Sequence, residues 1–320
     1  MNPNTRTPTS ESMTMLKRNG NNNGFTLMEL MIAMVIASIV AAAIMMSFDS
    51  QQKTQVNQQL VVEMQQDARA ALYLMQQDIR MAGYDETWED SNTDGVDDNR
   101  GSDGIDNDGI GGPDSANEDG DIAGIVEARP NFIQIRLDQN RNGDFRDDND
   151  LVTYALASGT ALTTIDPDGL ADAGAMEFKR CNKVGGNLER LAGSIQAVAF
   201  GYAFDDDGGV PDGLIDTDAS ANIIWGFDSD ADGFLDKQFD GNADGVIDET
   251  DAPIALATPV PINRIRAVRV WILARTRSPL RDHRQAQTYV VGNKIIAADD
   301  NYERVLLTTT VNCRNLGLRL

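Results

Sequence analysis

The spacing of hydrophobic residues divides the chain into three parts, and the first is a nearly continuous apolar run. From Phe25 to Phe48 the only charged residue is Glu29. As a helix rising about 1.5 Å per residue, this run would span about 36 Å, which is enough to cross a bilayer. Lys17 and Arg18 precede the run. The length and apolar character of the run predict a transmembrane segment over residues 25–48. The basic residues before it predict an N-terminus in the cytoplasm, by the positive-inside rule.

The second part is polar, but its hydrophobic residues recur every three or four positions. No Gly or Pro occurs between Phe25 and Ala82, and Gly83 is a natural stop. We therefore predict one helix over 25–82, about 87 Å long, whose second half packs on a globular head. A membrane anchor followed by a coiled coil would need a longer heptad repeat. The predicted buried stripe consists of Leu60, Val61, Met64, Ala68, Ala71, Leu72, Met75, Ile79 and Ala82.

In the third part, residues 83–320, runs typical of β-strands alternate with acidic tracts. A long helix followed by strands predicts an α+β fold in which the helix packs on an antiparallel sheet. The acidic tracts predict loop insertions at about 85–121, 138–150 and 205–251. Strands are expected at 131–138, 150–157, 174–181, 194–204, 265–276 and 304–315, where β-branched and aromatic residues are enriched.

Glu29 distinguishes between several interpretations of the apolar run. Inserting a carboxylate near the centre of a bilayer costs about 2.5–3.5 kcal/mol of free energy on insertion scales. A secretory signal cut after Ala43 would end before the apolar run does, and a simple signal anchor leaves the carboxylate unexplained. Thr26 and Glu29 also have the T-x-x-E spacing of a capping box, so Glu29 could cap the helix.

The stretch "GFTLMEL", followed by a long apolar helix, resembles the N-terminal signature of type IV prepilins. The resemblance implies that a prepilin peptidase cuts between Gly24 and Phe25 and removes residues 1–24 as a leader. The new N-terminal Phe25 would then be methylated. Glu29, the fifth residue of the mature chain, would pair with the N-terminal amine of a neighbouring subunit, which gives the carboxylate a cation.

Four stretches later in the chain resemble, in the same order, landmarks of PilW-type minor pilins. They are "MQQDIRMAGYD", "IQAVAFGYAFDDDG", "IRAVRVWILARTRSP" and "TTTVNCRN". The related J-type pseudopilins of type II secretion share some of them. Cys313 departs from this pattern, because an apolar residue is expected there.

The resemblance implies a pilin-like fold and a structural subunit that promotes pilus assembly and initiation at the tip. Its partners would be major and minor pilins, the prepilin peptidase, the inner-membrane assembly platform and a tip adhesin. The chain would cross the inner membrane once, with its head in the periplasm, and reach the cell surface in the pilus. Two alternatives stay open: a minor pseudopilin of type II secretion, and a membrane-anchored, calcium-dependent surface-binding module.

The chain is strongly acidic, with 50 Asp and Glu against 27 Lys and Arg and a formal charge of −23. Such a surface repels nucleic acid and attracts cations, so nucleic acid is not an expected partner. Within 228–236 and 240–251, carboxylates and amides alternate and Gly stands at position six, which is how a short loop wraps Ca²⁺. The loops begin 12 residues apart, too close for EF-hands, and resemble thrombospondin type 3 repeats.

Calcium is accordingly the expected cofactor, with sites in four tracts. Solvated acidic loops without metal are the alternative, and 205–218 is acidic but irregularly spaced. A fragment at 103–109 is similar but incomplete. The predicted ligands are Asp228, Asp230, Asp232 and Asp236; Asp240, Asn242, Asp244, Asp248 and Asp251; Asp90, Asn92, Asp94 and Asp98; and Asp138, Asn140 and Asn142.

Other residues give no sign of catalysis, and we expect no enzymatic activity. His283 has no nucleophile or acid in a catalytic pattern beside it. In an exported protein, Cys181 and Cys313 would form one disulfide, with two buried free thiols as the alternative. The basic cluster could contact DNA, but we expect it to pair with the acidic tracts or to face a neighbouring pilin. It comprises Arg264, Arg266, Arg269, Arg275, Arg277, Arg281 and Arg284.

Overall fold

The structure is a computed structural model of the chain. It describes residues 24–83, 124–137, 139, 150–171, 177–209 and 212–313. The chain divides into two units, one up to Thr54 and the other from Gln55 onwards. Each unit is therefore described by itself.

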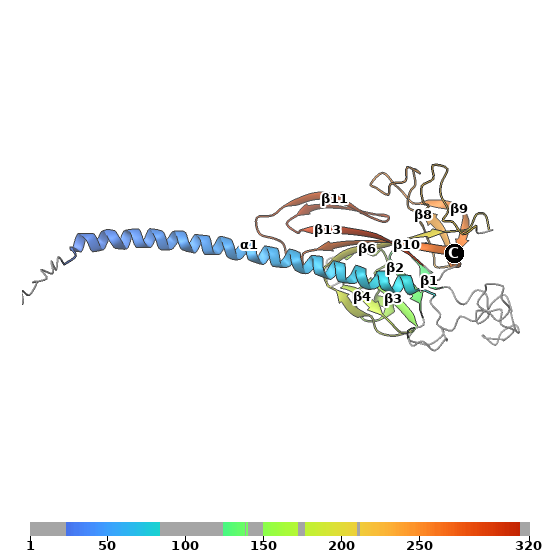
Figure 1. Cartoon of the computed structure of the whole chain (residues 1–320), viewed down its shortest axis with the longest axis horizontal. Coiled ribbons are helices and arrows are strands. Elements are labelled where there is room, and N and C mark those ends of the chain that lie inside the picture. Colours follow the sequence, from blue (N-terminus) through green and yellow to red (C-terminus); the bar gives the residue numbers. More distant parts are fainter. Residues whose placement is uncertain are drawn as a thin grey trace, which may run out of the picture. The chain divides into compact units, whose positions relative to one another are not determined.

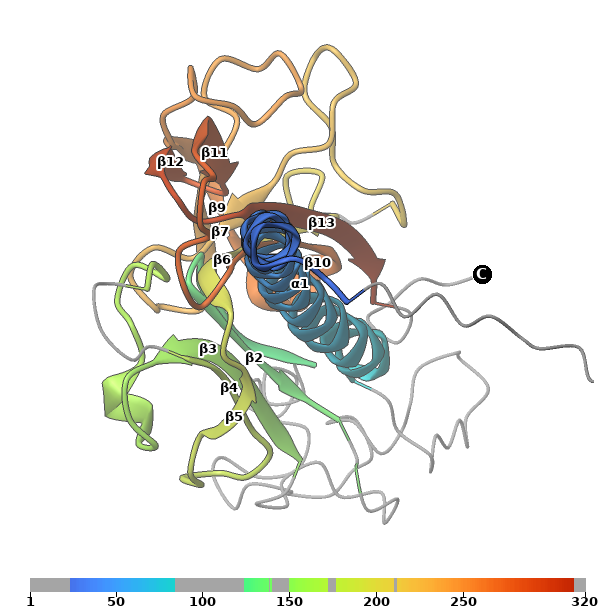
Figure 2. The same cartoon turned by 90° about the vertical axis from the view of Figure 1, so that its left-hand side faces the viewer.

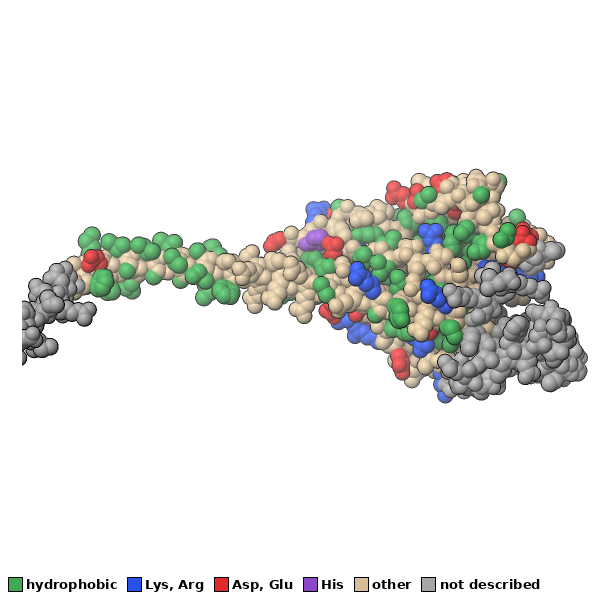
Figure 3. Space-filling view, viewed as in Figure 1, with side chains coloured by type: hydrophobic (Ala, Val, Ile, Leu, Met, Phe, Trp, Pro, Cys, Tyr) green, Lys and Arg blue, Asp and Glu red, His purple; other side chains and the backbone are tan. Residues whose placement is uncertain are grey.

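The described part of the first unit is the beginning of helix α1, which runs from Leu27 to Met81. The helix lies within two residues of the predicted range at either end. Every side chain from Phe25 to Phe48 is exposed, and apolar side chains line this segment (Figure 3). By length and composition the helix could cross a membrane, since its most apolar window has a mean hydropathy of 2.5. These side chains bury nothing within the chain itself.

In the second unit, the same helix has one buried face. Most of the predicted stripe is confirmed. Its half-buried members are Leu60, Val61 and Leu72, and its buried members are Met64, Ala68, Ala71, Met75, Ile79 and Ala82. These positions recur every three or four residues and therefore share one side of the helix. The helix ends at Met81, and Gly83 follows with φ near +70°, where the amide donates a 2.8 Å hydrogen bond to the Arg136 carbonyl.

The head contains two antiparallel sheets and a separate hairpin (Figure 1). The five-stranded sheet follows chain order: β1 (Ile125–Ala128), β2 (Phe132–Arg136), β3 (Leu151–Ala157), β4 (Glu177–Cys181) and β5 (Glu189–Ala192). The six-stranded sheet has the order β13-β10-β6-β7-β8-β9. Its strands are β6 (Ile195–Phe204), β7 (Gly226–Phe227), β8 (Phe234–Gln238), β9 (Ile254–Pro261), β10 (Ile265–Arg275) and β13 (Arg304–Asn312). The hairpin pairs β11 (Gln285–Val291) with β12 (Lys294–Asp300), and 3-10 turns occupy Leu162–Thr164 and Ile262–Arg264.

All six predicted strands are confirmed, as β2, β3, β4, β6, β10 and β13. The α+β class with antiparallel pairing is confirmed too, and the strands form two sheets and a hairpin. The unpredicted strands β5, β9, β11 and β12 carry many exposed residues, so they lack the apolar signal that marks a buried strand. Strand β1, also unpredicted, has only four residues. Strands β7 and β8 lie within 205–251, which was expected to be loop throughout.

The central strands β6 and β10 of the six-stranded sheet are buried on both faces. Strand β10 pairs in register with β6 and β13, which places Trp271 beside Ala199 and Thr308 on one face, and Val270 beside Thr309 on the other. Helix α1 lies beside β10 and β13 (Figure 2). It contacts the Thr309 face, where Gln76 Nε2 donates a 2.7 Å hydrogen bond to Thr309 Oγ1. The hairpin lies on the Trp271 face. A Cβ added at Gly292, in its turn, would come within 2.6 Å of Ala199 Cβ.

The predicted disulfide is wrong. Cys181 and Cys313 are both free and buried. Cys181 ends β4 in the five-stranded sheet, where its Sγ donates a hydrogen bond of 3.1 Å to the Lys183 carbonyl. Cys313 follows β13 in the other sheet, and burial raises the pKa of its thiol to about 12. Each cysteine packs in a different hydrophobic cluster. The disulfide is expected only on the ground that the protein would be exported, and the fold does not bring the two thiols together.

Candidate functional site

The N-terminal motif forms a complete capping box at the start of α1. The Thr26 amide and its Oγ1 both donate to Glu29 Oε2, each at 2.9 Å, while the Glu29 amide donates to Thr26 Oγ1 at 3.2 Å. These bonds satisfy amides that a helix start otherwise leaves unpaired. Gly24 and Phe25 precede the box, with open space around Gly24 and an exposed Phe25 ring. The bond that the motif predicts to be cleaved is therefore outside the helix.

The loop over 228–236 brings three of its four predicted ligands together. The carboxylate oxygens of Asp228, Asp230 and Asp232 lie within 4.8 Å of one another. Asp228 is buried and accepts hydrogen bonds from the amides of Ala231 and Gly233. Asp236, the fourth predicted ligand, instead accepts bonds from the Ser229 amide and hydroxyl at 2.8 and 2.6 Å.

The loop over 240–251 repeats the backbone of the first. Asp240 is buried and accepts bonds from the amides of Ala243 and Gly245, three and five residues on, as Asp228 does. In both loops the Ala at position four and the Gly at position six have positive φ. The other predicted ligands, Asn242, Asp244, Asp248 and Asp251, accept bonds from loop amides. Within the described residues, no three carboxylates of this loop converge as those of the first do.

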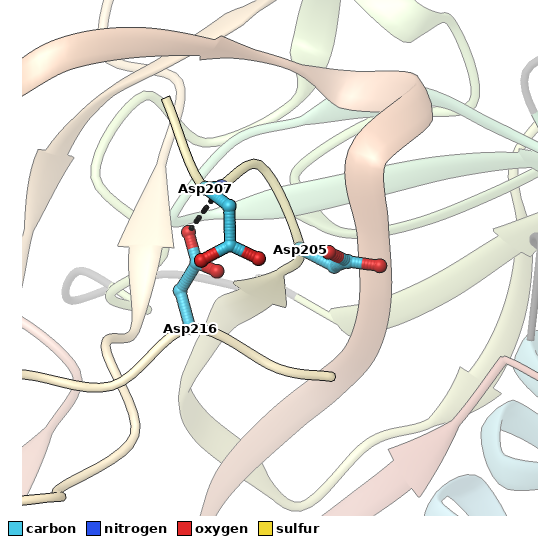
Figure 4. A group of neighbouring side chains, drawn as sticks. All are labelled: Asp205, Asp207 and Asp216. Atoms are coloured by element: carbon cyan, nitrogen blue, oxygen red, sulfur yellow. Dashed lines mark hydrogen bonds between the residues drawn. The ribbon is translucent and has the colours of Figure 1, made fainter. Parts of the chain in front are cut away.

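A third acidic group forms where the sequence spacing looked irregular. The carboxylates of Asp205, Asp207 and Asp216 also lie within 4.8 Å of one another (Figure 4). Asp216 accepts hydrogen bonds from the amides of Asp206 and Asp207. Desolvation raises the pKa of Asp216, and desolvation followed by neighbouring carboxylates raises that of Asp207. The i, i+2 pair Asp205 and Asp207 was a signal in the sequence, but only the fold brings Asp216 beside it.

The first loop has a spacing that suits a calcium ion. Oxygens bind Ca²⁺ at about 2.3–2.6 Å, so two ligands of one ion lie at most about 5 Å apart. The group formed by Asp228, Asp230 and Asp232 meets this limit. The group at Asp205 differs, because Arg266 Nε lies 3.5 Å from Asp205 Oδ2 and already supplies a cation. The predicted ligands at 90–98, 138, 140 and 142 lie outside the described residues.

The basic cluster has different partners at different positions. Arg266 pairs with Asp205 of an acidic tract, Arg277 with Glu63 and Asp67 of α1, and Arg284 with Asp299 of the hairpin. Arg269 and Arg275 instead stack on aromatic rings. The single histidine, His283, lies with its Nε2 3.0 Å from Glu303. The side chains of these five arginines therefore make contacts within the chain.

Sequence reasoning missed a buried ionic contact between helix and sheet. Asp78 on α1 accepts hydrogen bonds from Arg180 Nη2 at 2.9 Å and from the Tyr154 hydroxyl at 2.5 Å. Burial raises the pKa of Tyr154, and the neighbouring Asp78 adds to this effect. Asp78 falls between stripe residues Met75 and Ile79, so its position on the buried face was readable from the helix period.

Three family models match this chain. The prokaryotic N-terminal methylation motif matches residues 19–45, prepilin peptidase-dependent protein B matches 55–200, and type IV pilus-assembly protein W matches 173–315. No curated protein sequence matches it. Among solved structures, a type IV-like pilin from Thermus thermophilus aligns with 13% identity, 59% of this chain and 83% of that chain covered, and a TM-score of 0.29.

The exposed apolar helix, the capping box at the N-terminal motif and the matched family models all indicate the same class of protein. The chain belongs to the type IV pilin family. Within that family, the match over residues 173–315 groups its head with the PilW-like minor pilins. The matched families are structural, and none is an enzyme family.

Proposed function

We propose that this chain is a minor type IV pilin that helps to initiate pilus assembly, at or near the tip, and whose head loops are stabilised by calcium. The observation that carries the proposal is the apolar first segment of α1. Its side chains are exposed from Phe25 to Phe48 and follow a methylation motif. Such a surface needs either lipid or neighbouring helices to cover it.

In the proposed assembly process, lipid covers the apolar segment first and neighbouring helices cover it later. Before assembly, the segment crosses the inner membrane with the head in the periplasm, and the prepilin peptidase removes residues 1–24. After assembly, the same segment packs among the helices of major and minor pilins in the filament, and the head lies at the cell surface. The assembly platform and a tip adhesin are further partners in this scheme.

Glu29 has two roles to separate, because its carboxylate caps the helix of its own chain in the structure. We propose that in the filament it pairs with the amine of Phe25 of a neighbouring subunit. Glu29→Gln separates the two roles, since Gln also serves in a capping box but carries no charge. We expect the E29Q chain to be processed and inserted normally while surface pili, counted after shearing, fall at least tenfold.

Two controls accompany this experiment. Gly24→Val should leave an unprocessed chain that retains its leader, whereas Gly20→Val, within the leader, should be processed like the natural chain. Both are read by mass spectrometry of the N-terminus. Pili at the natural level with E29Q would mean that Glu29 only caps the helix, and the pairing role would be abandoned.

The calcium part of the proposal rests on the loops 228–236 and 240–251. It is supported by the convergence of Asp228, Asp230 and Asp232 and by the identical backbone turns of the two loops. The predicted ligands at 90–98 and 138–142 remain part of the proposal on sequence grounds alone. Bound Ca²⁺ would offset the repulsion between these carboxylates and hold the loops in one conformation for contact with partner pilins.

A further inference from the structure

A cleft of about 470 Å³ opens on the Trp271 face of the six-stranded sheet. Its walls come from β10, β11 and β13, and Ile247 of the 240–251 loop closes one side. The volume lies in the range of pockets that hold small ligands or a few residues of a peptide. Neither the methylation motif nor the acidic loops account for it.

Arg269 lies in this cleft, and among the described residues its charge has no counter-ion. Its guanidinium stacks 5.6 Å from the Trp225 ring centroid and 4.9 Å from that of Trp271. Both rings are buried. In the part of the chain that the structure describes, Arg269 makes no ion pair or hydrogen bond, although the sequence has 50 acidic residues. Burial lowers the pKa of Arg269, and no carboxylate opposes that effect.

A second arginine in the same cleft, Arg304, differs from Arg269 because it has a carboxylate partner. Arg304 donates two hydrogen bonds to Asp300, at 2.7 and 2.6 Å, and a third to Gln196. Its charge is therefore already matched within the chain. A carboxylate or a phosphate can form two parallel hydrogen bonds with one guanidinium. The guanidinium of Arg269 can therefore bind one such group, and the net charge of −23 favours a singly charged carboxylate over more highly charged phosphates and polyanions.

The wall made by β11 carries a second recognition element. Four consecutive residues, Gln287 to Val290, line the cleft. Because alternate side chains of a strand point to opposite faces, consecutive residues meet one cavity only when the edge of the strand faces it. Strand β11 pairs only with β12 in a two-stranded sheet, so its other edge has no strand beside it in the described structure. An unpaired edge is a template for an extended peptide.

We propose that this cleft receives an extended segment of a partner protein, with an Asp or Glu side chain of that segment on Arg269 and its backbone along β11. The inference rests on the proposed function only in taking a neighbouring pilin as the source of the segment. Ile247 would contact the bound segment, which brings the 240–251 loop into the same interface. Acidic sugars share the carboxylate but cannot pair with a strand edge, so the β11 edge favours a peptide.

The test uses the full chain in detergent and a fluorescent peptide, acetyl-Thr-Val-Thr-Glu-Val-Thr-Val-amide, followed by fluorescence anisotropy. A matched peptide has Gln in place of Glu, and glucuronate serves as a free acidic sugar. We expect the Glu peptide to bind at least tenfold more tightly than the Gln peptide, and Arg269→Gln to remove this difference. Arg190→Gln is the control, because Arg190 pairs with Glu177 at the five-stranded sheet.

Hydrogen exchange then locates the peptide. Amides of Gln287 to Val290 should exchange more slowly when the Glu peptide is bound, and thermal melts should show that R269Q remains folded. Equal binding of both peptides, no binding at millimolar concentration, or protection away from β11 would each overturn the proposal. Displacement by glucuronate as strong as by unlabelled peptide would overturn the peptide assignment. Leader removal and E29Q pilus counts test the proposed function separately, since neither involves Arg269.

Discussion

Helix α1 contains two segments that have the same secondary structure but differ in what covers their apolar side chains. Between Leu27 and Phe48 its apolar side chains are all exposed, whereas from Met64 to Ile79 one apolar face is buried against the head. The first segment is apolar all round, and the second is apolar on one side only. A helix of the first kind is stable only with a partner from outside the chain, such as lipid or other helices, while the second kind uses its own sheets.

The largest expected difference along α1 concerns two ion pairs, one in the buried segment and one just beyond the exposed segment. Asp78→Ala would leave the half-buried Arg180 and the buried Tyr154 hydroxyl without their acceptor, and we expect the free energy of unfolding to fall by about 3–5 kcal/mol. Asp49→Ala removes an acid from the exposed pair with Lys53, and should cost about 1 kcal/mol or less. Urea unfolding of the full chain in detergent, followed by tryptophan fluorescence, measures both. Equal losses would show that Asp78 is not a buried anchor.

Two methionines test the same comparison without charge. Met75 is 0% exposed and Met34 is 65% exposed. Met75→Ala should lower the free energy of unfolding of the head by about 2–5 kcal/mol, because it removes buried surface and leaves a cavity. Met34→Ala should change it by less than about 0.5 kcal/mol. The same unfolding curves decide this, and a loss at Met34 as large as at Met75 would contradict the division into two segments.

Calcium should stabilise the head and leave the first segment unaffected. At ten times the Kd, each occupied loop would add about 1.4 kcal/mol, seen as a rise in Tm over the same melt in EGTA. Mg²⁺ is the control ion. Asp228→Asn should reduce the rise, whereas Asn in place of Asp282, which lies outside the loops, should not. A Tm unchanged by Ca²⁺ would leave the loops as solvated acidic turns on the same pilin.

The smallest effect concerns a partly exposed pair on the head. Hydrogen bonds from Arg304 hold the pKa of Asp300 at about 2, below its ordinary value of 3.8. Its contribution is therefore fully present above about pH 4 and is lost as the pH falls towards 2. Because Asp300 is partly exposed, Asp300→Asn should cost about 1 kcal/mol or less at pH 7. Melts of both chains should differ at pH 7, and the difference should shrink to about a third at pH 2.5, half a unit above the folded-state pKa.

The motifs that could be predicted from the sequence are those whose residues are close together along the chain. The helix, its buried stripe, the Thr26–Glu29 box and six strands all depend on short periods, and each appears in the structure. The loops 228–236 and 240–251 share the turn that their spacing predicts. Only the first, however, brings three carboxylates together, because Asp236 and the later acids instead bond to nearby donors.

The sequence by itself determined the pilin class of this protein, its apolar helix and the position of the processing motif, because these follow from composition and spacing along one segment. Only the tertiary structure decided which distant residues meet. It packed Cys181 and Cys313 in separate hydrophobic clusters, brought Asp216 to Asp205 and Asp207, and placed Arg269 against two indole rings in a cleft lined by β11. Such encounters depend on strand order and register, which long-range packing sets and no short-range pattern encodes.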